Sequence, residues 1–284
     1  MKKINKKVAV CAVLGSIFSV QSGASIAKYL FHLLGPGGAV TLRVGLAGII
    51  LALINRPRLR HFKARQWKCV FLYGASIGLM NLVWYYGIQR IPLGVGVTIE
   101  FIGPLTLAFC TSRKAVDFLW AFLATIGIIL IVPWANPAEC DPIGVGLVLL
   151  SGVFWASYIV MTDRITRLMR PKDAVTLGLC VAALVVLPAG LISGDLFHLD
   201  GRLLLIGFSV ALFSSILPFT LDLYSMKGLQ EKTYSILMSL EPAGAALSGF
   251  IFLGERLSLL QCFAMACVIA ASVGATCTAP KNKK

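Results

Sequence analysis

The sequence predicts an all-α integral membrane protein with ten transmembrane helices in two inverted five-helix repeats. Three observations lead to this fold class: an apolar composition, a series of membrane-length apolar runs, and a weak internal repeat. Of the 284 residues, 58% are hydrophobic and 13% are charged, with a mean hydropathy of +0.85. A soluble domain of this length is nearer half apolar and a quarter charged. The surplus of apolar side chains is therefore expected to face lipid.

Ten apolar runs extend along the whole chain, each close to the roughly 20 helical residues that cross about 30 Å of hydrocarbon. They comprise residues 8–27, 37–54, 67–88, 92–111, 117–132, 142–161, 174–192, 203–221, 233–253 and 258–277. Because the runs are continuously apolar rather than alternating, they predict helices and not a transmembrane barrel. The first run lacks a small-residue cleavage site, so we interpret it as a spanning helix rather than a signal peptide.

The net charge of +14 follows the predicted topology. If the N-terminus is cytoplasmic, nearly all Lys and Arg residues fall on the cytoplasmic side. The exceptions are Lys28, Arg90, Arg202 and Arg256 outside, and Arg43 within a span. This positive-inside bias predicts two cytoplasmic termini and an external loop at residues 137–141. The expected partners of the basic side are anionic lipid headgroups, and no nucleic acid.

A duplication near residue 137 is indicated by matches at one constant shift, which pairs Tyr86 with Tyr224 and Pro104 with Pro242. The predicted units are residues 1–136 and 137–284. Each would hold five helices, an odd number, so the second would enter the membrane in the opposite orientation to the first. Inverted repeats suit alternating access, in which a site at their interface faces one side of the membrane and then the other.

Three charged residues lie clearly inside predicted spans, away from their ends, where an ionisable group is costly and usually functional: Arg43, Glu100 and Glu241. Glu100 is roughly 12 Å deep by helical rise. Pro104 leaves the carbonyl group of Glu100 without its helical hydrogen bond, which predicts a kink there. Glu100 either forms a buried salt bridge with Arg43 or binds a proton or substrate, and the two readings are compatible.

Glu241 directly precedes Pro242, a position biased away from helical geometry, which favours a helix break at membrane depth. Its carboxylate either belongs to a functional site or caps backbone amides at the break. Pro104 and Pro242 are accordingly the candidate hinges.

Uncharged polar residues add to the candidate site: Gln21, Ser22, Asn81, Trp155 and Tyr158. The run from Gln21 to Ser25 is small and polar, which fits either a cavity lining or close helix packing. Trp155 and Tyr158 are about one helical turn apart, so they share a face that forms either a pocket wall or ordinary packing.

No motif for catalysis, nucleotide binding or a metal site is found, so we expect neither an enzyme nor a bound cofactor. The eight cysteines contain no CxxC pair and are interpreted as small apolar residues within a bundle.

Six segments together resemble one family. They are Gln21 to Lys28, Leu42-Arg43, Pro92-Leu93-Gly94, Glu100 to Leu105, Met238 to Pro242, and Ile251 to Glu255. Nearly the entire chain is similar to the threonine/homoserine exporters of the drug/metabolite transporter superfamily, EamA type. The resemblance implies ten helices in two inverted EamA repeats, a bacterial inner-membrane location, and secondary transport with export coupled to the proton gradient. It implies no set of substrate ligands.

The combined prediction is a proton-coupled exporter of small neutral amino acids such as threonine or homoserine. Glu100 or Glu241 would bind the ammonium group and Arg43 the carboxylate group. The alternatives are a carrier of the same fold for another solute, such as an aromatic amino acid or a drug, or an amino-acid importer. The expected partners are the amino acid, protons and membrane lipids, and a homodimer is left open.

Overall fold

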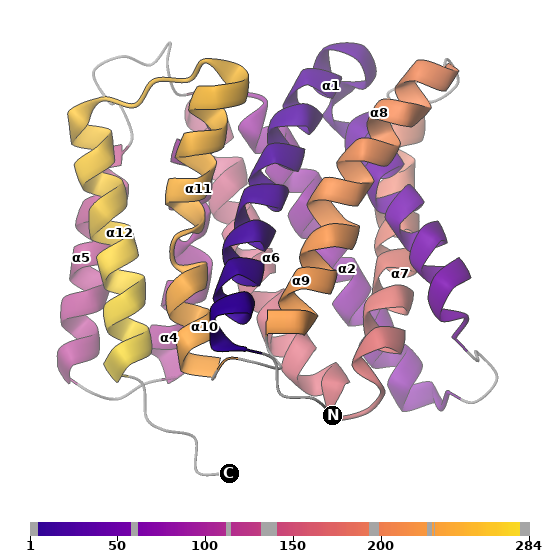
Figure 1. Ribbon diagram of the computed structural model, residues 1–284, viewed down its shortest axis with the longest axis horizontal. Coiled ribbons are helices and arrows are strands. Elements are labelled where there is room, and N and C mark those ends of the chain that lie inside the picture. Colours follow the sequence, from indigo (N-terminus) through magenta and orange to yellow (C-terminus); the bar gives the residue numbers. More distant parts are fainter. Residues whose placement is uncertain are drawn as a thin grey trace.

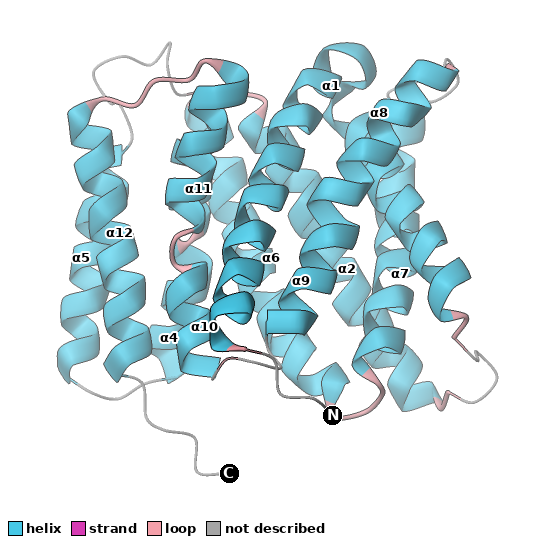
Figure 2. Cartoon of the chain, in the orientation of Figure 1, coloured by secondary structure: helices cyan, strands magenta, loops and turns pink. Residues whose placement is uncertain are grey.

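The computed structural model describes residues 5–57, 62–111, 115–131, 141–192, 199–225, 229 and 231–278, and every regular element within them is helical (Figure 2). Five helices are continuous: α2 (Ala64–Ile88), α5 (Ala115–Ile131), α6 (Pro142–Thr166), α7 (Pro171–Ile192) and α12 (Leu259–Thr278). The predicted external loop at residues 137–141 lies outside the described residues except for Asp141.

The longest element is α1 (Lys6–Asn55), which covers the first two predicted spans. It bends at Gly35, whose φ of 59° is readily adopted only by glycine, and Pro36 follows directly. At its start, the Asn5 side chain accepts a hydrogen bond from the Lys7 N–H, as a helix N-cap does. The first two predicted spans are therefore two helical arms of α1, joined at the non-helical residue Gly35.

Three predicted spans are interrupted. Residues 92–111 form α3 (Leu93–Glu100) and α4 (Ile102–Thr111). Residues 203–221 belong to α8 (Gly201–Ala211), the π-helical turn η4 (Leu212–Ile216) and α9 (Leu217–Ser225). Residues 233–253 belong to α10 (Glu231–Met238), α11 (Glu241–Ser248) and the second π-helical turn η5 (Gly249–Leu253). The predicted breaks beside Pro104 and Pro242 are both present, at Phe101 and at Ser239-Leu240.

Six helical stretches in the described residues are long and apolar enough to cross a membrane: α1, α2, α6, α7, Ile236–Leu253 and α12. Three shorter apolar stretches accompany them, Leu93–Leu107, Phe118–Ile131 and Gly201–Ile216. The chain is thus an all-helical, multi-pass membrane protein, while the count of ten spans and the inverted repeat stay predictions. Helix α1 begins and α12 ends at the same end of the bundle (Figure 1).

The packing of the helices on one another defines the bundle. Helix α2 packs against α6 and α7, and α1 packs against α7, α8 and α9. Helices α5 and α12 pair at one side of the bundle (Figure 1). Helix α3 lies between the α5–α12 pair and the rest of the bundle, and it packs against α6 and α11.

One close approach fixes the break between α3 and α4 against α6. A Cβ atom built on Gly103 would overlap the backbone carbonyl of Gly152, and one on Gly152 would lie 2.8 Å from the Glu100 carbonyl oxygen. Glycine is required at both positions because the obstacle is backbone. This contact positions Glu100 beside α6.

An ion pair ties three segments together. The Lys28 Nζ atom lies 2.5 Å from Glu255 Oε1 and also donates to the Ile91 carbonyl oxygen at 3.0 Å. The second carboxylate oxygen of Glu255 accepts the Leu93 N–H at 2.7 Å. Glu255 therefore joins α1, the start of α3, and the connection between α11 and α12, which Figure 1 shows at the end of the bundle opposite the first residues of α1.

We expect Glu255→Ala to lower the apparent melting temperature of the purified protein by about 5 °C. The substitution leaves the half-buried Lys28 ammonium and the Leu93 N–H without their partner, a loss of roughly 2 kcal/mol. The matched control is Asp163→Ala, because Asp163 forms an exposed i,i+4 pair with Arg167 that contributes about 0.5 kcal/mol or less. Equal melting temperatures for the two variants would show that the Lys28–Glu255 pair does not stabilise the fold.

Candidate functional site

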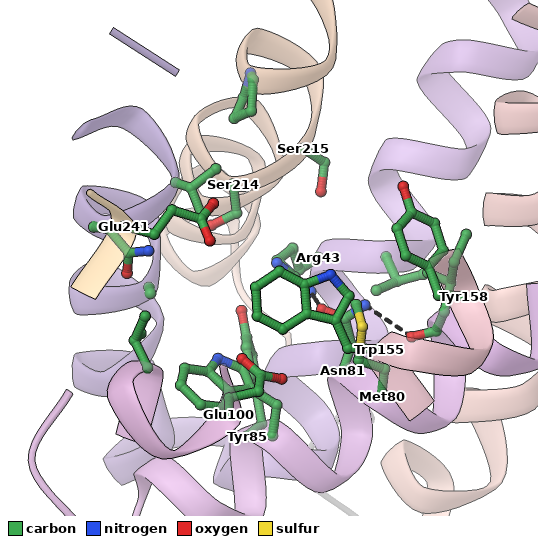
Figure 3. Close-up of a pocket in the computed structure, with 18 of the residues that line it drawn as sticks. Arg43, Met80, Asn81, Tyr85, Glu100, Trp155, Tyr158, Ser214, Ser215 and Glu241 are labelled. Atoms are coloured by element: carbon green, nitrogen blue, oxygen red, sulfur yellow. Dashed lines mark hydrogen bonds between the residues drawn. The ribbon is translucent and has the colours of Figure 1, made fainter. Parts of the chain in front are cut away.

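A cavity of about 230 Å³ lies within the bundle and is lined by residues from both predicted halves. Its walls come from both arms of α1, from α2, α3, α6 and α7, and from η4, α9 and α11. Seven of the eight predicted polar site residues line it: Gln21, Arg43, Asn81, Glu100, Trp155, Tyr158 and Glu241. Ser22 does not, although it is buried. Figure 3 shows the labelled side chains converging on this space from different helices.

Arg43 is held on the α2 side of the cavity. Its Nη2 atom donates to the Asn81 side-chain oxygen, and Asn81 in turn donates to the Ile77 carbonyl at 2.8 Å. The guanidinium carbon lies 4.9 Å from the centre of the Tyr85 ring, a cation–π geometry. Arg43 is only 8% exposed, and its Nε atom has no hydrogen-bond partner among the described residues. An N–H donor is thus left for a ligand.

The salt bridge between Arg43 and Glu100 that the sequence allowed is not formed. The ion pairs found in the described part of the chain are Lys28–Glu255, Arg90–Asp141 and Arg167–Asp163. Arg43 turns to Asn81 instead, and Glu100 has a different partner. Both charges therefore lie at the cavity without neutralising each other directly.

Glu100 is the last residue of α3 and is 9% exposed. Its Oε1 atom contacts the Ser151 hydroxyl group, and the same hydroxyl oxygen lies 3.1 Å from the Met80 carbonyl oxygen. A hydroxyl group has one proton, so Ser151 donates either to Glu100 or to Met80. When Ser151 donates to Met80, its oxygen can accept a proton carried by Glu100. The geometry thus accommodates both the ionised and the protonated carboxyl group.

Glu241 is the first residue of α11, directly after the break at Ser239-Leu240, and Pro242 is the second. A carboxylate at a helix N-terminus is favoured by the helix dipole. The Glu241 side chain lines the cavity, and the start of α11 has no side-chain hydrogen bond that caps it. Glu241 is close enough to Glu100 and Asp222 to interact with both electrostatically. The two helix breaks therefore bring two carboxylates to one cavity from different helices (Figure 3).

Two further sequence features, the run from Gln21 to Ser25 and the pair Trp155 and Tyr158, both line the cavity and pack against neighbouring helices. In the run from Gln21 to Ser25, Gln21 and Ala24 line the cavity while Gly23 packs directly against Ser214 in η4. Trp155 and Tyr158 line the cavity and also pack on neighbours: Trp155 lies edge-on to Phe101 with ring centres 5.1 Å apart, and Tyr158 stacks on Tyr73 at 5.5 Å.

Several residues of the site were not predicted from the sequence. Those that line the cavity include Tyr85, Ser214, Ser215, Pro218 and Asp222, and Ser151 contacts the Glu100 carboxyl group. Asp222 was excluded because the predicted span ended at Leu221. The helical spacing of 214, 218 and 222 indicates one shared face, and so does the spacing of 151, 155 and 158. Among the described residues no group of His, Cys, Asp and Glu could hold a metal ion.

A polar cavity with one arginine and three carboxylates, enclosed by membrane-length apolar helices, defines a membrane transport protein. Comparison with known proteins gives the family. The EamA-like transporter family matches residues 142–277. The "Threonine/homoserine exporter RhtA" of Escherichia coli (strain K12) is 38% identical over 286 residues, spanning 100% of this chain and 96% of the relative. The protein of the same name in Salmonella typhimurium (strain LT2) is 40% identical, and the match covers 98% of this chain and 94% of that relative. The chain belongs to the EamA-like transporter family.

More distant matches agree with this family. An "Uncharacterized transporter YwfM" of Bacillus subtilis (strain 168) is 24% identical over 78% of this chain and 77% of its own. One solved crystal structure matches 97% of this chain and 99% of its own with a TM-score of 0.59. Its sequence identity of 16% supports the fold alone. The EamA-like match and the two threonine/homoserine exporters confirm the prediction of a transporter rather than an enzyme.

Proposed function

We propose that the protein is a proton-coupled exporter of small neutral amino acids such as threonine or homoserine, located in a bacterial inner membrane with both termini in the cytoplasm. The observation that carries the proposal is the cavity, in which a cationic donor and carboxylates face one space, combined with 38–40% identity to threonine/homoserine exporters over nearly the whole chain. The relatives do not favour the alternative of another solute or of import.

The chemistry of the cavity matches a zwitterion. A free amino acid needs a donor for its carboxylate group and an anion for its ammonium group. The unpartnered Nε–H of Arg43 supplies the first, and the carboxylates supply the second. The cavity volume of about 230 Å³ lies below the roughly 300–1,000 Å³ of sites for drug-sized ligands. Size and charge therefore favour a small amino acid over a drug.

Glu100 is proposed as the proton-coupling residue. It is buried without a cation in ion-pair contact among the described residues, and an isolated buried carboxylate costs free energy that a bound proton removes. Ser151 can serve the carboxyl group in either protonation state, as its geometry shows. Proton binding and release at Glu100 would then alternate with the two orientations of the cavity.

We expect Glu100→Gln to retain threonine counterflow in proteoliposomes. Its accumulation of threonine under an imposed pH gradient should fall at least about tenfold below that of the wild type. The amide keeps the shape and the Ser151 hydrogen bond but cannot titrate. Asp163→Asn, at an exposed carboxylate outside the cavity, is the matched control and should behave as the wild type. If Glu100→Gln keeps its full response to pH, Glu100 is not the coupling residue, and Glu241 is tested next. If the wild type exchanges none of the twenty amino acids or homoserine, the proposed function itself fails.

A further inference from the structure

Asp222 is the third carboxylate of the cavity wall, beside Glu100 and Glu241. Its Oδ1 atom is buried and has no hydrogen-bond partner among the described residues. The hydroxyl groups of Ser16 and Tyr234 lie close to the same carboxylate. These two neighbours can fix the orientation of the side chain, which leaves one oxygen of a cavity-lining carboxylate unsatisfied. A buried acceptor without a donor is costly unless a ligand supplies one.

Glu241 interacts electrostatically with two other carboxylates of the cavity wall, most strongly with Glu100 and also with Asp222. Two like charges held close together in a low-dielectric site repel each other, and a cation between them removes that repulsion. Glu100 differs from Asp222 in this respect, because its Oε1 atom accepts from Ser151, whereas Asp222 Oδ1 is a buried acceptor without a donor among the described residues. The acceptors available to a cationic ligand are therefore on α9 and α11.

The donors lie on another part of the wall. The Arg43 Nε–H and the Tyr85 hydroxyl group are both buried without a hydrogen-bond partner among the described residues, and both residues line the cavity. Arg43 is 8% exposed and Tyr85 is 1% exposed, so water is not their ordinary partner. Unsatisfied donors on one side and an unsatisfied acceptor on another match a ligand that carries a carboxylate at one end and an ammonium group at the other.

We propose that Asp222, together with Glu241, binds the ammonium group of the substrate, and that Arg43 and Tyr85 bind its carboxylate group. The proposal rests on the proposed amino-acid transport and deepens it, because it assigns the ammonium group to a residue pair that excludes Glu100. Glu100 is then free to carry the coupling proton while the substrate is bound. Substrate and proton occupy different carboxylates of one cavity.

The test compares threonine with its hydroxy-acid analogue, in which a hydroxyl group replaces the ammonium group. Dissociation constants are measured with the purified full-length protein by ligand-induced thermal stabilisation. The wild type is expected to bind threonine about 30-fold more tightly than the analogue, and Asp222→Asn to bring this ratio close to one. Asp163→Asn, which removes an exposed carboxylate, should keep the wild-type ratio. A purely structural role would weaken both ligands equally, so an unchanged ratio in Asp222→Asn overturns the proposal.

A measurement on the wild type covers the case in which Asp222→Asn does not fold. Carbodiimide modification of Asp222 in the presence of glycine ethyl ester, followed by mass spectrometry as loss of the unmodified Asp222 peptide, should be slowed at least tenfold by threonine and not by the hydroxy acid. Equal protection by both ligands, or by neither, overturns the proposal. If another amino acid binds instead of threonine, that amino acid and its hydroxy acid replace the pair. The proposal that threonine is the substrate is then wrong, while the proposed role of Asp222 is still tested.

Discussion

Replacing Gly103 by alanine is expected to lower the apparent melting temperature of the purified protein by about 8 °C, as measured by size-exclusion of heated samples. The added methyl group would overlap the backbone carbonyl of Gly152. Overpacking typically costs about 1–3 kcal/mol and sometimes more. The cost here should be at the upper end, because a carbonyl group on the facing helix cannot rotate away as a side chain can.

The matched control is Gly146→Ala in α6, the helix that also carries Gly152. A Cβ atom on Gly146 meets nothing within 4 Å. Alanine is favoured over glycine in a helix interior by about 0.8–1.0 kcal/mol, so this variant should be as stable as the wild type or more stable. A Gly103→Ala protein with the wild-type melting temperature would contradict the close packing of α4 on α6.

The contact between Gly103 and Gly152 could not be predicted from the sequence. Hydropathy identifies where an apolar run begins and ends, but it does not tell which face of one helix meets which face of another. The sequence placed Glu100 beside a proline-induced break, and that break is present at Phe101. The rotation of α4 that sets Gly103 against Gly152, and thereby Glu100 against Ser151, required the fold.

The partner of Arg43 was missed for the same reason. Arg43 and Glu100 are at comparable predicted depths, so a salt bridge was a reasonable expectation. Depth alone leaves the direction of each side chain open, however, and Arg43 points toward Asn81 and Tyr85 on α2. Seven of the eight predicted polar site residues do line the cavity, because an ionisable or amide group within a span is rarely placed against lipid.

Asp222 was not among the predicted site residues because of the boundary of a predicted span. The predicted span of residues 203–221 ends one residue before Asp222. The helix in fact continues to Ser225. Pro218 and the π-helical turn η4 lie just before it, and π-helical turns often occur at functional sites. A charged residue at the end of an apolar run is therefore better tested by helical spacing than removed by a hydropathy average.

Replacing Arg43 by methionine is expected to reduce the rate of threonine exchange in proteoliposomes by more than about 100-fold. Arg43 is the cationic residue that lines the cavity, where Glu100, Asp222 and Glu241 also lie. In the proposed complex Arg43 pairs with the buried carboxylate group of the substrate. Removing one partner of such a buried pair costs about 3–5 kcal/mol, which corresponds to more than a hundredfold in affinity. Methionine keeps most of the side-chain volume, so the effect reports charge and hydrogen bonding rather than a cavity.

Arg43→Lys separates charge from geometry. Lysine keeps the positive charge, but its ammonium group lacks the planar fork that donates to Asn81 and still has a second N–H, at Nε, without a partner among the described residues. Its exchange rate should be intermediate between those of the wild type and Arg43→Met. The exposed Arg167, changed to methionine, serves as the control and should exchange threonine at the wild-type rate.

The double variant Arg43→Met with Glu100→Gln tests whether these two charges stabilise each other. Because no ion pair joins them, removing Glu100 should restore neither exchange nor the melting temperature of Arg43→Met. Full restoration of folding in the double variant would show that the two charges are coupled across the cavity and that Arg43 has a chiefly structural role. Exchange by Arg43→Met within tenfold of the wild type would show that Arg43 does not bind the substrate carboxylate.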